Sequence, residues 1–197
     1  MASLTNQGEK SMSVLRALTF IGGMLLSSVA AADTDGLPFG NTEACMHGPM
    51  AQFGQYIGDW KIEDSQLAQD GSGWADGDGA RWIFTCFGNG SAVQDFWFPA
   101  NGSIGTNLRT YNPDTETWEI AWTVDKLPGF THIRAQQNDD GEIVMQYVSP
   151  AQTPMRRITF FPLDATGWKW TLEFSNDAGA SWFEVYRITA TPFAELH

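Results

Sequence analysis

The chain has 197 residues, of which 43% are hydrophobic and 13% aromatic, and its formal net charge at pH 7 is −12. This composition is typical of a globular protein with a substantial core, and it excludes a low-complexity chain. Because a strongly acidic surface repels phosphate backbones and anionic headgroups, the charge argues against nucleic acid and membrane surfaces as partners.

The N-terminal segment, residues 1–32, resembles a secretory signal peptide. Lys10 and Arg16 supply a basic start, the apolar run 17–26 follows, and the small residues 27–32 suit a cleavage site. The run is too short to span a bilayer as a helix, which takes about 20 apolar residues. We therefore predict a periplasmic or secreted protein, with no stable membrane insertion after removal of the signal. An uncleaved anchor is the alternative.

Residues 33–52 are predicted to form a leader with a short helical turn, ahead of a folded domain at 53–192. Cys45 in the leader and Cys86 in the domain are the only cysteines. An even number of cysteines in an exported chain favours a disulfide between them, and two buried free thiols are the alternative.

The domain contains ten strand patterns with turn sequences between nearly all of them, and residues 70–79 are predicted to be a loop. Because no helical period of 10–15 residues separates the strands, a parallel sheet is excluded. The pattern predicts an all-β, antiparallel barrel of about eight to ten strands, with a sandwich as the alternative. The expected strands are 56–63, 80–87, 92–98, 105–111, 117–124, 130–136, 142–148, 155–161, 168–174 and 182–190.

Alternation of apolar and polar residues predicts which side chains face the barrel interior. Side chains two residues apart in a strand share a face, so an apolar series at this spacing marks the buried face. Two such series, both rich in tryptophan, are Trp118, Ile120, Trp122, Val124 and Trp168, Trp170, Leu172, Phe174.

The first strand opens with Gly58-Asp59-Trp60, and Arg187 lies near the end of the last strand. This pair resembles the lipocalin-like arrangement, in which a Gly-x-Trp is covered by an arginine from the last strand. The resemblance predicts that Trp60 closes one end of the barrel and that the Arg187 guanidinium stacks on its ring. An ordinary core tryptophan is the alternative.

The segment from Ser175 to Trp182 resembles an Asp-box, the hairpin pattern Ser-x-Asp-x-Gly-x-x-Trp. Asp177 is expected to accept hydrogen bonds from backbone amides across the turn, Gly179 to adopt a positive φ, and Trp182 to pack beneath the loop. The motif recurs in unrelated β proteins, so it predicts local structure and no activity.

Four segments together are similar to a family of small bacterial exported lipocalin-like (calycin-type) β-barrel proteins of mostly unassigned function. These segments are Gly105-Thr-Asn-Leu-Arg-Thr-Tyr-Asn-Pro, Thr117-Trp-Glu-Ile-Ala-Trp, Ile143-Val-Met and the hairpin that ends at Trp182. The similarity covers residues 53–190. It implies a lipocalin-like barrel and identifies no catalytic residue.

A ligand site is predicted inside the barrel, with an apolar wall and a basic end. Arg109, His132 and Arg134 are expected to converge on the anionic end of a small ligand, because no acid stands near them in their own strands. A solvated outer face with ion pairs between strands is the alternative. Tyr111 shares the face of Arg109, and the predicted wall comprises Trp97, Trp118, Trp122, Tyr147 and Trp170.

Two other functions are also compatible with the sequence. In the first, the barrel is a lyase, isomerase or hydrolase without a cofactor, in which His132 and Glu173 carry acid–base catalysis. In the second, exposed tryptophans form a carbohydrate-binding platform. The three histidines lack metal-ligand spacing, so we expect no metal site and no cofactor. The oligomeric state is left open.

Overall fold

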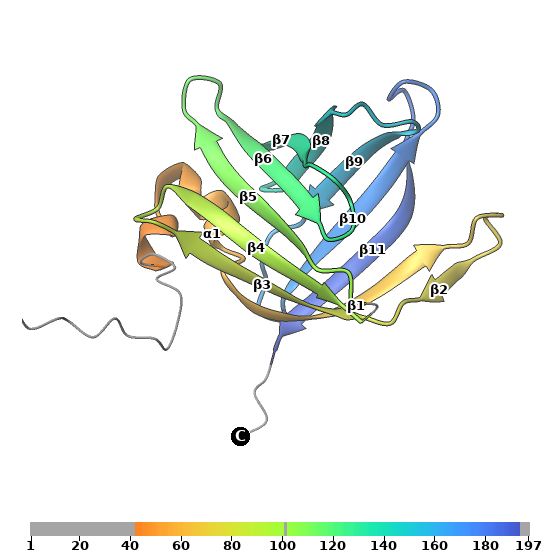
Figure 1. The fold of residues 1–197 in the computed structure, drawn as a ribbon, viewed down its shortest axis with the longest axis horizontal. Helices are drawn as coiled ribbons and strands as arrows, with labels where there is room; N and C mark the ends of the chain where they lie inside the picture. The colour runs from red at the N-terminus through yellow and green to blue at the C-terminus, as the bar shows by residue number, and fades with distance from the viewer. Residues whose placement is uncertain (1–41, 101, 194–197) are drawn as a thin grey trace, which may run out of the picture. The chain divides into compact units, whose positions relative to one another are not determined.

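The structure, a computed structural model, describes residues 42–100 and 102–193 (Figure 1). The expected signal peptide, residues 1–32, and the start of the leader lie outside the described residues, so both stay predictions. The described residues belong to one compact unit, 36–197. Among them, no helix is long and apolar enough to span a membrane.

Three short helical segments precede the strands. They are the 3-10 helices η1 (Thr42–Cys45) and η2 (Gly48–Met50), and the one-turn helix α1 (Ala51–Gly54). The close approach of α1 to η1 depends on Gly54, because a Cβ atom built there would lie only 1.9 Å from the Cys45 carbonyl oxygen. A glycine at this position therefore lets α1 pack directly on η1.

All ten expected strands are present, and an eleventh lies where a loop was expected. That additional strand, β2, pairs with the end of β1, which continues four residues beyond its expected end. The strands are β1 (Gly58–Leu67), β2 (Trp74–Asp76), β3 (Ala80–Phe87), β4 (Ala92–Pro99), β5 (Gly105–Asn112), β6 (Thr117–Val124), β7 (Thr131–Gln137), β8 (Ile143–Ser149), β9 (Met155–Phe160), β10 (Trp168–Ser175) and β11 (Phe183–Pro192).

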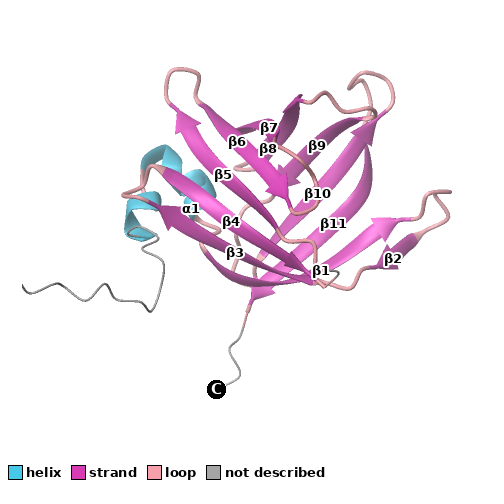
Figure 2. Cartoon of the chain, viewed as in Figure 1, coloured by secondary structure: helices cyan, strands magenta, loops and turns pink. Residues whose placement is uncertain are grey.

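Ten of the strands close into an antiparallel barrel, as the sequence predicts. The order runs from β11 through β10 down to β3 and then β1, and β1 also pairs with β11, which closes the sheet. Closure leaves no free strand edge around the barrel. The short β2 adds to the projecting end of β1 at the side away from the helices (Figure 2).

The helices close one end of the barrel with aromatic side chains. Phe53 contacts Trp118 edge-on at 4.9 Å between ring centroids and lies 5.6 Å from Phe160. Tyr56 lies 5.2 Å from Trp168, and its hydroxyl donates to the Phe161 carbonyl oxygen at 2.9 Å. The alternation predicted inward faces for the strands at 117–124 and 168–174, and burial of Trp118, Ile120, Trp168 and Trp170 confirms it.

Trp60 and Arg187 do not meet, so the predicted stacking is wrong. Trp60 is buried, packs on Trp168 at 5.8 Å, and its indole N–H donates to the Tyr56 carbonyl oxygen at 2.7 Å. Arg187 is paired across the sheet with Ser65 and stacks on Trp74 at 3.9 Å. The reason is strand parity: Ile188 faces inward, so its neighbour faces outward.

The Asp-box forms as predicted between β10 and β11. The Asp177 carboxylate accepts a hydrogen bond from the Ser181 backbone N–H at 2.9 Å, and Gly179 has a φ of +90°. The Trp182 indole N–H donates to the Gly179 carbonyl oxygen at 3.1 Å. Hydrogen bonds from Ser181, and a further one from Ser175, lower the pKa of Asp177 to about 2.

The predicted disulfide between Cys45 and Cys86 is present, and it ties η1 to the end of β3. We expect reduction, or a Cys45→Ala/Cys86→Ala double substitution, to lower the free energy of unfolding by about 4 kcal/mol. The reason is that the bond closes a loop of 41 residues in the unfolded chain. Urea unfolding followed by tryptophan fluorescence, with and without reductant, measures the change. An unchanged midpoint would contradict a stabilising role for the bond.

Candidate functional site

A cavity of about 290 Å³ lies inside the barrel. Inward side chains from nine strands, β3 to β11, surround it, and many of them are aromatic. The lining residues that carry the argument are Trp82, Trp97, Trp122, Trp170, Tyr147 and Tyr186, together with Asn107 and Arg109.

Each of β3 to β11 contributes at least one side chain to the lining, and β1 and β2 contribute none. A second hollow of about 410 Å³ adjoins the cavity toward the open end of the barrel and shares Trp97, Trp122 and Tyr186 with it. The second hollow therefore forms a mouth next to the cavity, on the side away from the helices.

Five of the eight residues predicted to bind ligand line this cavity. They are Trp97, Arg109, Trp122, Tyr147 and Trp170. Tyr111 shares the inward face of Arg109, as expected, but lies nearer the closed end, where it packs edge-on against Trp118 at 5.5 Å. Trp118, predicted for the wall, also lies outside the lining, and its indole N–H donates to the Gln52 side chain at 2.8 Å.

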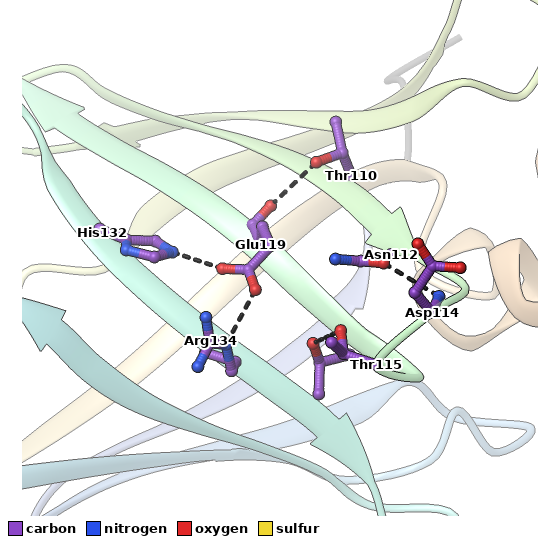
Figure 3. Close-up of polar contacts among 8 residues, drawn as sticks. Thr110, Asn112, Asp114, Thr115, Glu119, His132 and Arg134 are labelled. Carbon is purple, nitrogen blue, oxygen red and sulfur yellow. Dashed lines mark hydrogen bonds and ion pairs between the residues drawn. The ribbon is translucent and has the colours of Figure 1, made fainter.

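His132 and Arg134 lie on the outer face of the barrel, so the predicted convergence with Arg109 is wrong. Both contact Glu119 on the neighbouring strand β6, Arg134 through its Nε at 2.8 Å and His132 through its Nε2 (Figure 3). The physical reason is again parity, because Ile133 between them is buried and lines the cavity. The compensating acid comes from the adjacent strand.

The pKa of Glu119 reflects this pairing. Burial would raise the pKa of its carboxyl group, but the hydrogen bonds and charges of Arg134 and His132 outweigh that effect and lower the pKa. The three residues thus form a partly exposed ion-pair cluster across β6 and β7. Such a cluster stabilises the register of two strands.

Glu173, the other catalytic candidate, also faces outward. Its carboxylate accepts two hydrogen bonds from Arg157 on β9, each at 2.8 Å, and the Arg157 guanidinium stacks on Trp182 at 4.5 Å. His132 and Glu173 therefore have different partners, and neither lines the cavity. The structure does not bring the two predicted acid–base residues together.

Arg109 is the cavity residue with the most unusual surroundings. Its side chain and that of Asp95 are both 0% exposed, and Nη2 of Arg109 lies 2.5 Å from Oδ2 of Asp95. Asn107 holds the carboxylate in place, since its backbone N–H donates at 3.0 Å and its amide nitrogen at 3.0 and 3.1 Å. The Asp95–Arg109 pair therefore brings a formally neutral but strongly polar group to the cavity wall.

Aromatic rings surround the Arg109 guanidinium. Its central carbon lies 4.8 Å from the ring centroid of Phe53, 5.2 Å from that of Phe84 and 5.9 Å from that of Phe160. Nε and Nη1 have no hydrogen-bond partner among the described residues. Burial lowers the pKa of Arg109, and the charge of Asp95 opposes that shift. Two donor nitrogens of Arg109 therefore lie buried at the cavity wall without an acceptor among the described residues.

Sequence reasoning missed several residues of the cavity. Trp82 and Tyr186 line it, and the alternation of β3 and β11 could have identified both, because they share a face with buried apolar residues. Tyr186 donates from its hydroxyl to Asp64 at 2.6 Å. Burial, with a smaller contribution from Asp64, raises the pKa of Tyr186. Asp95 was not among the predicted ligand-binding residues, and its partner Arg109 lies on the next strand.

The structure also shows where the tryptophans and the potential metal ligands lie. All nine tryptophans fall in the described residues, and Trp74 is the one among them that is exposed. A flat row of exposed tryptophans, which a carbohydrate platform would need, is therefore not formed. Within 42–100 and 102–193, no three His, Cys, Asp or Glu side chains gather in a way that could hold a metal ion.

The closed ten-strand barrel is consistent with a lipocalin-like barrel. A comparison with protein-family models gives no match to this chain, and a comparison with curated proteins gives none either.

Proposed function

We propose that this protein is an exported lipocalin-like barrel that binds a small, partly apolar ligand in its aromatic cavity. The observation that carries the proposal is the cavity of about 290 Å³, whose wall combines four tryptophans with Arg109, two of whose donor nitrogens have no acceptor among the described residues. Enclosed apolar pockets with a few convergent polar groups are typical of small-molecule sites. The intramolecular disulfide suggests an oxidising compartment, which supports export.

The chemistry of the wall indicates what such a ligand would look like. Aromatic side chains would contact an apolar body, ring or chain. Nε and Nη1 of Arg109 would donate to an oxygen of the ligand, while Asp95 already neutralises the guanidinium charge. The deep end of the cavity therefore suits a neutral acceptor group at least as well as an anion.

A fluorescent probe tests cavity binding directly. We expect the uncharged dye N-phenyl-1-naphthylamine to bind with a blue-shifted emission, and Leu172→Trp to weaken binding about tenfold, because the larger side chain would fill the cavity that Leu172 lines. Titration with direct excitation of the dye gives the dissociation constant of each variant.

Leu108→Trp is the matched control, because Leu108 is exposed on the outer face of β5. It should leave the dissociation constant of the dye within about twofold of the unmodified protein. Melting temperatures of both variants would show that each is folded. Equal weakening in the two variants, or no binding to the unmodified protein, would contradict the proposed function.

A further inference from the structure

Arg156 is the one arginine in the described part of the chain that forms no ion pair with a carboxylate. This is unexpected in a protein with a net charge of −12, in which acids outnumber bases. The ion pairs of the other five described arginines are Arg81–Asp59, Arg109–Asp95, Arg134–Glu119, Arg157–Glu173 and Arg187–Glu184.

The side chain of Arg156 faces the barrel interior near its open end. In β9 it precedes Ile158 and Phe160, which line the cavity, and it shares their face at the two-residue spacing. Its guanidinium carbon lies 5.8 Å from the ring centroid of Tyr147, itself a cavity residue, and 5.4 Å from that of Phe174. Arg156 therefore lies next to the cavity on the side away from the helices.

The described residues satisfy the hydrogen-bond donors of Arg156 only in part. Its Nε is buried and has no hydrogen-bond partner among the described residues. Burial raises the pKa of Tyr147 and the charge of Arg156 opposes this rise, so the phenol hydroxyl and the guanidinium influence each other. A guanidinium flanked by two aromatic rings and a phenol hydroxyl offers donors for an oxyanion.

We infer that Arg156 and Tyr147 bind the anionic group of the ligand, and that the ligand is an amphipathic organic anion such as a carboxylate or sulfonate. The inference rests on the proposed function, since the apolar body would occupy the aromatic cavity. The charge is assigned to Arg156 because Asp95 already neutralises Arg109, whereas no acid in the described part of the chain forms an ion pair with Arg156. The ligand would thus lie with its charged group toward the mouth and its apolar part toward Arg109.

Two dyes that differ by one sulfonate test this assignment. They are 1-anilinonaphthalene-8-sulfonate and its uncharged parent, N-phenyl-1-naphthylamine. We expect Arg156→Gln to weaken binding of the sulfonate about tenfold or more, since a charge-assisted hydrogen bond is lost, and to change binding of the parent dye by less than about twofold. Arg156→Lys should retain most of the affinity for the sulfonate, because it keeps the charge.

Arg157→Gln is the matched control, because it removes the same charge from the next residue, which faces outward. It should leave sulfonate binding within about twofold of the unmodified protein. Equal loss in Arg156→Gln and Arg157→Gln, or equal loss of both dyes in Arg156→Gln, would overturn the inference. Failure of the uncharged dye to bind the unmodified protein would instead contradict the proposed function, so the two failures are distinguishable.

Discussion

Asp95→Asn is expected to lower the free energy of unfolding by about 3–5 kcal/mol, although it changes one atom of the side chain. Asp95 and Arg109 are both fully buried, and their ion pair lies inside the barrel. The substitution leaves the guanidinium buried without a counter-charge, and an arginine does not lose its proton under ordinary conditions. Urea unfolding followed by tryptophan fluorescence measures the loss.

A second substitution separates the charge from the shape of the side chain. Adding Arg109→Met to Asp95→Asn should recover most of the lost stability, because a buried neutral pair carries no uncompensated charge. Glu119→Gln is the control on the outer face, where the same acid-to-amide change should cost no more than about 1 kcal/mol. A double variant less stable than Asp95→Asn alone would contradict this explanation.

Trp60→Ala is expected to cost about 3–5 kcal/mol of unfolding free energy. Trp60 is 7% exposed, packs against Trp168, and donates its indole N–H to the Tyr56 carbonyl oxygen. The substitution would leave a cavity beside the aromatic cluster of the closed end and would remove that hydrogen bond. Thermal and urea unfolding of the variant measure the effect.

Arg187→Ala distinguishes this account from the lipocalin-like stacking that the sequence suggested. Because Arg187 contacts Trp74 and Glu184 and not Trp60, its removal should cost less than about 1 kcal/mol. Trp74→Ala, at an exposed tryptophan, serves as the control for loss of an indole ring. If Arg187→Ala were as destabilising as Trp60→Ala, the outward placement of Arg187 would be wrong.

Features that depend on neighbours in the chain could be predicted from the sequence. The ten barrel strands follow from two-residue alternation and turn residues, and both are local properties. The Asp-box is local as well, because its hydrogen bonds join residues 175–182 to one another. The disulfide could be paired because the chain has only two cysteines.

Alternation also indicates which way the basic side chains face. His132 and Arg134 flank Ile133, which is buried, so the period of β7 by itself indicates that both face outward. Ile158 and Phe160 in the same way indicate that Arg156 faces inward. These side-chain directions were available from the sequence, whereas the partners of the side chains were not.

Only the tertiary structure decided which charges are paired. Glu119 meets Arg134, and Asp95 meets Arg109, because the register between neighbouring strands places them side by side. Register depends on how turns, bulges and the packed interior fit together over the whole barrel, and no short segment specifies it. The sequence by itself therefore determined the strands and their inward faces, while the closure of the barrel determined that Arg156 lies beside the cavity with no acid from the described strands paired to it.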